Sequence, residues 1–301
     1  MSTTAELIHR LKTVTLNTDS QKEVRELLQA LRKFGLIELR LHPTNEFIRA
    51  RTLKDNETVR VVRDLSYCPN HLNTTYQRAS TQNKTMFYSV LVQPEFTPNG
   101  FLAMGRATSL LESWPLMRDK SGKGIQKIAY GKWTNTRDMR LAAIVYNDQF
   151  AGNNPKTEML HEAFKQHVQQ LHGFANETLT ITGFLADEYS KEPIPTQYDY
   201  MISAIFTEIA VEKGFDGVLY PSVRTAGQGL NVAITPDFVD RFMELRAAGE
   251  CIVLKNGEIT VVLNDTVAII PRGQNDLKLR PFDDPAKLEA EKKYEMKRLG
   301  L

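Results

Sequence analysis

Seven polar or aromatic residues, spread along the chain, have side chains that could act together on an anionic substrate. They are Arg49, Arg51, Arg78, Tyr88, Glu112, Ser222 and Asn231. Arginine offers planar, permanently charged donors that bind phosphate oxygens in pairs, which lysine does not. An aromatic face can stack on a flat ring, and a carboxylate can stabilise positive charge that develops during bond cleavage. Taken singly, each residue also has an ordinary explanation as a surface, core or turn residue.

Short strands, a loop and a helix are expected to position the first five of these residues. Residues 47–51 (FIRAR) and 86–92 (MFYSVLV) are typical of strands, so Arg49 and Arg51, two residues apart, share one strand face. Residues 68–84, rich in Pro, Asn, Thr and Ser, predict a loop that carries Arg78. Residues 107–112 predict a short helix that ends near Glu112.

The rest of the chain mixes helical and strand patterns without the regular alternation of a doubly wound sheet. Apolar spacing predicts N-terminal helices, the second capped by Ser20 with Glu23 and stopped at Gly35. Further expected helices are 158–172, 198–213 and 285–301. Expected strands are 215–220, 231–234, a hairpin of 125–133 with 140–146, and a hairpin over 250–270 that turns at Asn256-Gly257. The sequence therefore predicts an α+β fold.

Composition and missing motifs exclude several classes of protein. Thirty-eight Lys+Arg against 36 Asp+Glu give a formal net charge of +2, too small a field for a general nucleic-acid coat. There is no apolar run long enough for a membrane span and no signal peptide, which predicts a cytoplasmic protein. Two cysteines, Cys68 and Cys251, allow no disulfide framework.

Metal, nucleotide-fold and hydrolase signatures are missing as well. His161, His167 and His172 are separated by six and five residues, which does not place two of them on one helix face as metal binding would require. Residues 227–229 (GQG) lack the third glycine of a dinucleotide-binding motif, and residues 121–124 (SGKG) are too short for a P-loop. No G-x-S-x-G is present. We therefore expect no metal site.

The order and surroundings of the seven residues resemble the RES-domain family, named for an Arg, a Glu and a Ser. The resemblance covers roughly residues 45–240. Its most specific part is DGVLYPSV at residues 216–223, followed after a glycine-bearing turn by NVAI at 231–234. The segments FIRAR, MFYSVL and ATSLLES precede it in the family's order.

This resemblance assigns a role to each residue. The family's first arginine falls on Arg49, with Arg51 as an alternate, and the second falls on Arg78, where Gln77 replaces the family's usual glycine. The aromatic residue falls on Tyr88, the serine on Ser222 and the asparagine on Asn231. The glutamate falls on Glu112, 24 residues after Tyr88, with Glu95 as the fallback.

The resemblance also implies a fold, a reaction and a partner. Family members resemble toxins of bacterial toxin–antitoxin pairs, and their core is a split β-sheet like that of ADP-ribosyltransferases. Their usual partner is an antitoxin protein that has a helix-turn-helix domain. They consume NAD as a substrate, without a separate cofactor, by phosphorolysis, by hydrolysis or by transfer of ADP-ribose to a macromolecule. Arg49, Glu112 and Ser222 would be catalytic, and Arg49, Arg51, Arg78, Tyr88, Ser222 and Asn231 would bind NAD. A scaffold that binds nucleotides without turnover is the non-enzymatic alternative.

The matched region suggests a division of the chain into three parts. Residues 1–40 are expected to form a helical extension, residues 41–275 the RES-like catalytic domain, and residues 276–301 a charged helical tail.

Overall fold

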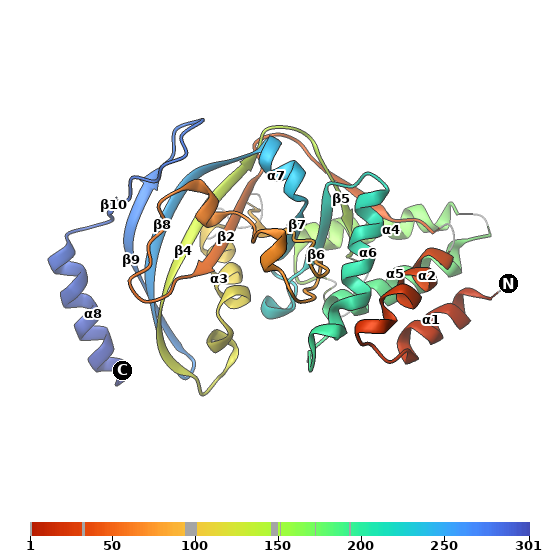
Figure 1. The fold of residues 1–301 in the computed structure, drawn as a ribbon, viewed down its shortest axis with the longest axis horizontal. Coiled ribbons are helices and arrows are strands. Elements are labelled where there is room, and N and C mark those ends of the chain that lie inside the picture. The colour runs from red at the N-terminus through yellow and green to blue at the C-terminus, as the bar shows by residue number, and fades with distance from the viewer. Residues whose placement is uncertain are drawn as a thin grey trace. The chain divides into compact units, whose positions relative to one another are not determined.

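The computed structural model describes residues 2–31, 34–93, 101–145, 150, 152–171, 173–192 and 194–301, with the backbone alone for residues 101–103. The chain forms two compact units, each built from separate segments. The first unit comprises Met1–Leu41, Tyr67–Tyr88 and Asp138–Asp240, and the second comprises His42–Ser66, Ser89–Arg137 and Arg241–Leu301. Both contain helices and strands, which confirms the α+β class (Figure 1). The three-part division of the chain stays a prediction.

A four-stranded arrangement underlies the first unit. Its strands are β1 (Ile37–Leu41), β5 (Met139–Ala143), β6 (Gly217–Pro221) and β7 (Leu230–Ile234), paired in that order. Only β5 and β6 run parallel. A side chain at Gly217 would meet the carbonyl oxygen of Ala233 at 2.1 Å, so this close approach of β6 to β7 requires glycine.

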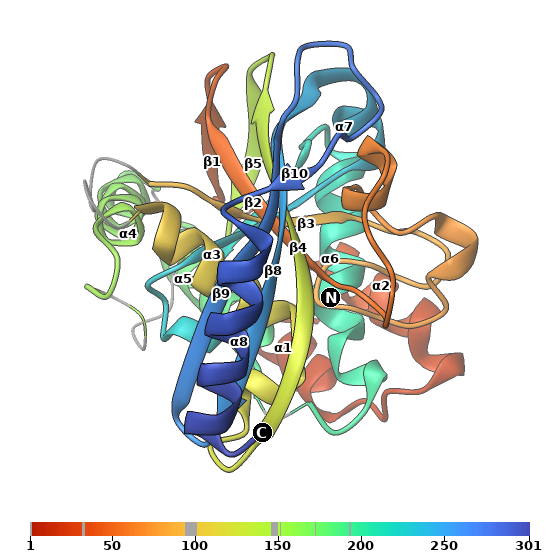
Figure 2. The same ribbon diagram turned by 90° about the vertical axis from the view of Figure 1, so that its left-hand side faces the viewer.

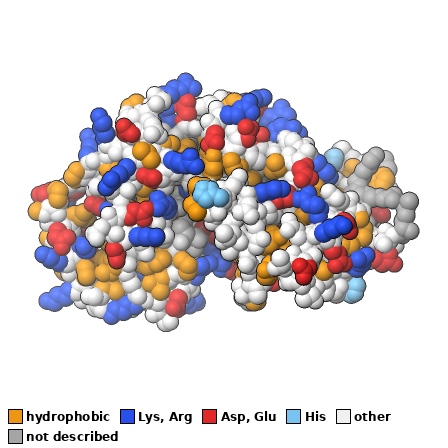
Figure 3. Space-filling view, viewed as in Figure 1, with side chains coloured by type: hydrophobic (Ala, Val, Ile, Leu, Met, Phe, Trp, Pro, Cys, Tyr) orange, Lys and Arg blue, Asp and Glu red, His pale blue; other side chains and the backbone are white. Residues whose placement is uncertain are grey.

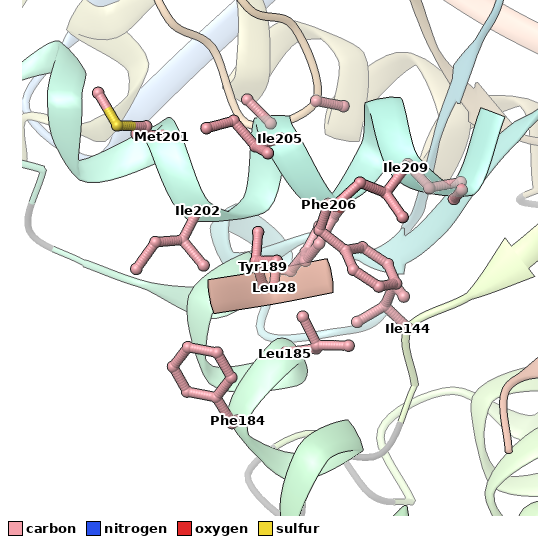
Figure 4. Packing of buried hydrophobic residues seen from close by; sticks show 14 of the residues in the cluster. Leu28, Ile144, Phe184, Leu185, Tyr189, Met201, Ile202, Ile205, Phe206 and Ile209 are labelled. Carbon is pink, nitrogen blue, oxygen red and sulfur yellow. The ribbon is translucent and has the colours of Figure 1, made fainter. Parts of the chain in front are cut away.

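Helices make up much of the rest of the first unit. They are α1 (Thr4–Thr13), α2 (Gln21–Ala30), α4 (Pro155–Gln169), α5 (Ala175–Ser190) and α6 (Met201–Glu212), followed by α7 (Pro236–Phe242), in which the chain passes into the second unit. Nine of the 12 residues of α6 are buried, because it lies between β6 on one side and α2 and α5 on the others. Its apolar side chains pack with Leu28 of α2 and with Phe184, Leu185 and Tyr189 of α5 (Figure 4).

Long antiparallel strands dominate the second unit. Its strand order is β3 (Phe87–Leu91), β2 (Glu46–Thr52), β4 (Lys123–Asn135), β8 (Met243–Asn256), β9 (Ile259–Ile269) and β10 (Arg280–Pro281). The chain passes from the first unit into the second within β3. The expected hairpin turn at Asn256-Gly257 is confirmed, with Gly257 at φ +60°.

Two helices cover opposite faces of this second sheet. The first, α3 (Phe101–Ser113), packs through Leu110 against Ile48 and Val253. The second, α8 (Pro285–Leu299), packs against Leu254 and Leu263. Figure 2 shows α8 alongside β8 and β9. Val253 and Leu254 are neighbours on β8, and neighbouring residues of a strand point to opposite faces. The helix expected at the C-terminus is thus part of the second unit's core.

Three local expectations from the sequence are wrong. Residues 125–133 and 140–146 do not form a hairpin, since β4 pairs with β2 and β8, whereas β5 pairs with β1 and β6. The buried Asn135 ends β4 by donating to the carbonyl oxygens of His42 and Arg137, and the chain then enters the other unit. A short connection between two strands favours a hairpin, but here strands from distant parts of the chain pair with each of them instead.

The start and end of α2 also differ from expectation. Ser20 precedes the helix, but its hydroxyl bonds the backbone of Asn17 rather than the first turn of α2. The full capping box lies earlier, between Thr3 and Glu6. The helix stops at Ala30 and not at Gly35. Helix α5 was not expected at all, because its threonines and Gly183 weaken the helical pattern.

Some expectations lie outside the described residues, namely those for Glu95, Tyr146 and His172. None of the described helices combines the length and apolar character needed to cross a membrane. Acidic and basic side chains are interspersed on the face shown in Figure 3, as expected from a formal net charge of +2.

Candidate functional site

Arg78 lies at the tip of a tight turn in the first unit. The backbone amide of Gln77 donates to the carbonyl oxygen of Ser80 at 2.8 Å, and that of Ser80 donates back at 3.1 Å, so only Arg78 and Ala79 lie between them. Gln77 does not adopt a positive φ angle. The glycine expected here from the resemblance is therefore not needed by the backbone at this position.

The guanidinium of Arg78 is held at the C-terminal end of α5. It donates to the carbonyl oxygen of Tyr189 and, at 3.4 Å, to that of Lys191, and it lies 5.2 Å from the ring centroid of Tyr200. The last carbonyls of a helix lack partners within the helix and carry partial negative charge, which stabilises a cation. All three contacts are to neutral groups, and no carboxylate pairs with Arg78 in the described part of the chain. Its charge is oriented without being neutralised.

Tyr88 fixes the turn that carries Arg78. Its hydroxyl accepts a hydrogen bond from the amide of Ala79 at 3.0 Å and lies 2.8 Å from the Ser80 hydroxyl. Burial raises the pKa of Tyr88 to about 12, although both hydrogen bonds and the charge of Arg78 act in the opposite direction. The phenol is therefore neutral at physiological pH and acts as a hydrogen-bonding strut.

Further tyrosines connect this turn to the end of β6. The rings of Tyr189 and Tyr220 lie 5.2 Å apart, centroid to centroid. Tyr220 stands opposite Asn231 in the pairing of β6 with β7, which places Asn231 on the same face of the sheet. Burial raises the pKa of Tyr189, and the charge of Arg78 lowers it.

Ser222 follows β6 directly and opens the turn that leads into β7. Its amide donates to the carbonyl oxygen of Gly229, and its own carbonyl accepts from Gly227, both at 2.8 Å. The turn contains Ala226 at φ 48° and Gly227 at φ 81°. Ser222 is fully buried, so its hydroxyl is not exposed to solvent in this structure.

Arg49 and Arg51 lie in the second unit on one face of β2, as predicted. The Arg49 Nε donates to the carbonyl oxygen of Ser66 at 3.1 Å. Arg51 donates to the carbonyl oxygen of Asp64 at 3.1 Å and forms an ion pair with Glu57. Arg51 is therefore partly neutralised by a carboxylate, unlike Arg78.

Glu112 lies near the end of α3 and is exposed. Helix α3 covers the sheet face that bears Ile48, to whose carbonyl oxygen the buried Ser109 hydroxyl donates at 3.1 Å. Arg49, the next residue along β2, points to the other face. The second unit thus holds Glu112 and Arg49 on opposite sides of its sheet and does not bring them together.

Four residues near the end of α5 escaped the sequence analysis. Tyr189 and Tyr200 contact Arg78, and Arg224 forms an ion pair with Glu192. Because α5 was not expected, nothing pointed to Tyr189 or Glu192. Arg224, which directly follows the most specific matched segment (residues 216–223), was the available signal.

No protein-family model matches the chain, and no curated protein matches it. Among the described residues, no group of three or more His, Cys, Asp or Glu side chains is placed to hold a metal ion. The first unit offers an arginine that is oriented but not neutralised, which is suited to bind an anionic ligand.

Proposed function

We propose that the protein consumes NAD by breaking the bond between nicotinamide and ribose, that its core is of the ADP-ribosyltransferase type, and that it is the toxin of a toxin–antitoxin pair. The observation that carries the proposal is the state of Arg78, whose guanidinium is oriented by carbonyl oxygens and a ring but not neutralised. Such a group is suited to bind a diphosphate, since a phosphate can supply the negative charge that its present contacts lack.

Each candidate residue has a task in this reaction. As nicotinamide leaves, positive charge develops at the ribosyl carbon, and Glu112 is the carboxylate proposed to stabilise it. Within the first unit, Arg78 is proposed to hold the diphosphate, and Tyr88 and Asn231 are proposed to shape the binding site around it. Ser222 is proposed to hydrogen-bond the substrate. Attack by water yields ADP-ribose, nicotinamide and a proton, whereas attack by phosphate yields the phosphate ester of ADP-ribose and nicotinamide.

The test is to incubate the purified protein with NAD, with and without phosphate, and to quantify nicotinamide by chromatography. We expect release, reduced about 100-fold or more by Glu112→Gln, which corresponds to about 2.7 kcal/mol of lost transition-state stabilisation. Glu258→Gln, at an exposed turn between β8 and β9, is the matched control and should behave as wild type. Label transferred from NAD to a macromolecule would identify that acceptor instead. Folded protein without nicotinamide release in any buffer would disprove the proposal.

A nucleotide-binding module without turnover is the second candidate. The placement of Glu112 and Arg49 on opposite sides of the second unit's sheet favours it, because the carboxylate and this arginine cannot then serve one bound ligand from α3 and β2. It predicts NAD binding by calorimetry without nicotinamide release, and equal affinity in wild type and Glu112→Gln.

A further inference from the structure

Arg224 and Glu192 form an ion pair beside the residues that hold Arg78. Arg224 belongs to the short helical turn η7 (Val223–Thr225), directly after Ser222. Glu192 follows Lys191, whose carbonyl oxygen accepts from Arg78. The side chain of Arg224 is 18% exposed and that of Glu192 is 34% exposed. Both arginines therefore lie at the C-terminal end of α5, and Glu192 is the more exposed member of the ion pair.

The turn that carries Arg224 is held independently of this ion pair. The amide of Gly229 donates to the Thr225 hydroxyl at 2.9 Å, in addition to the backbone bonds of Ser222. The side chains of Asn153 and Asn154, at the start of α4, donate to the carbonyl oxygens of Ala226 and Gln228 at 2.8 and 2.6 Å. Because the turn is already fixed, the ion pair is not required to hold it in place.

The chemistry of the two arginines differs in one respect. Arg78 contacts only neutral groups, whereas Arg224 is paired with a carboxylate whose two oxygens match the guanidinium fork as a phosphate does. A diphosphate carries two negative groups, so a second arginine near the first would bind its second phosphate. A phosphate arriving at Arg224 would have to displace Glu192.

We propose that Arg224 is a second diphosphate-binding arginine and that Glu192 is its internal counter-ion, which occupies the phosphate position until substrate binds. The inference rests on the proposed function. Glu192 then lowers the affinity for the diphosphate, because binding must break the existing pair and return the carboxylate to water. This competition would limit binding of other anions that cannot engage both arginines.

The experiment measures binding of ADP-ribose by calorimetry and the KM for NAD in wild type, Glu192→Gln and Arg224→Ala. We expect Glu192→Gln to bind ADP-ribose about tenfold more tightly, equivalent to about 1.4 kcal/mol, and to lower KM. Arg224→Ala should bind at least about tenfold more weakly and raise KM more than it lowers kcat. Glu212→Gln, which removes one carboxylate partner of Arg25 elsewhere in the first unit, is the control and should bind as wild type. Thermal unfolding verifies that each variant is folded.

The outcomes separate this inference from the proposed function. A merely structural ion pair would give unchanged or weaker binding in Glu192→Gln, and that result overturns the inference whatever Arg224→Ala does. If the wild type releases nicotinamide but both variants keep its KM and its affinity for ADP-ribose, the inference about Arg224 and Glu192 is overturned. The proposed function then still stands. Wild type that neither binds ADP-ribose nor releases nicotinamide overturns both.

Discussion

Two cations, Arg78 in the first unit and Lys127 in the second, are held in opposite ways. In the first unit, Arg78 is bound by two carbonyl oxygens and an aromatic ring. In the second, Lys127 lies 2.6 Å from the carboxylate of Glu250, which is 1% exposed, and 3.2 Å from that of Asp265. The Glu250 carboxylate also accepts from the Thr58 hydroxyl at 2.5 Å and from the Val59 amide at 2.9 Å.

The difference teaches which arginines and lysines are available for a ligand. A cation paired with buried carboxylates has its charge cancelled and serves to hold chain segments together. Burial lowers the pKa of Lys127, but hydrogen bonds and charges from Glu250 and Asp265 outweigh it and leave that pKa raised. A cation held by dipoles keeps a full charge, which an anion can neutralise at little cost in protein contacts.

The largest expected effect comes from removing the buried Glu250 carboxylate, which binds Lys127, Thr58 and Val59 in the second unit. Glu250→Ala leaves Thr58 and Val59 without their buried acceptor and Lys127 with the Asp265 carboxylate alone, so we expect a loss of about 3–5 kcal/mol in the free energy of unfolding. Glu244→Ala, which removes the pairs with Arg246 and with the exposed Arg272, should cost less than about 1 kcal/mol. Urea unfolding measures both. Equal losses would mean that Glu250 has no special structural role.

The next-largest effect tests Arg78, whose charge no carboxylate neutralises in the described part of the chain. Arg78→Ala should lower the rate of nicotinamide release at low NAD concentration about 100-fold, and Arg78→Lys should restore little of it because lysine lacks the planar fork. Arg25→Ala serves as control, since Arg25 is paired with Glu208 and Glu212 in the same unit. If Arg25→Ala and Arg78→Ala reduce nicotinamide release equally, then an arginine held by carbonyl oxygens does not differ in function from one paired with carboxylates.

The smallest effect concerns Tyr88, whose hydroxyl hydrogen-bonds the turn that carries Arg78. Tyr88→Phe removes hydrogen bonds to Ala79 and Ser80 and should cost about 1 kcal/mol in unfolding free energy at pH 7. The pKa of Tyr88 is about 12 in the folded protein and about 10 when unfolded, so its contribution is complete below pH 10 and is lost as pH rises toward 12. Urea unfolding at pH 9 and pH 11 should therefore show a smaller pH-dependent loss in Tyr88→Phe than in wild type. An identical loss in both proteins would contradict this account.

Part of the fold followed from the sequence because the signals were local. Strands β2 and β3, the 250–270 hairpin and the final helix were predicted from alternation, from Asn256-Gly257 and from a charged helical pattern. The paired side chains of Arg49 and Arg51 on one face of β2 followed from the period of a strand. Helix α5 was missed because its burial, and not its propensity, stabilises it.

The candidate site could be predicted only in part, because the sequence pattern carries local signals and not long-range contacts. Residue type and order singled out Arg78, Tyr88 and Ser222, since arginine, tyrosine and a serine in a glycine-bearing turn carry chemical meaning by themselves. The carbonyl oxygens that hold Arg78, those of Tyr189 and Lys191, lie 111 and 113 residues away along the chain. No periodicity within a short window encodes such a contact.

The sequence by itself determined the α+β class, most strand positions and a set of candidate residues for binding an anion. The tertiary structure decided that β4 and β5 belong to different units, that Glu112 and Arg49 face opposite sides of one sheet, and that Arg78 keeps its charge while Arg51 shares it with Glu57. The physical reason is that side-chain type and local spacing set what a residue can do. Which groups neutralise, bury or orient it depends on contacts that only the folded chain brings together.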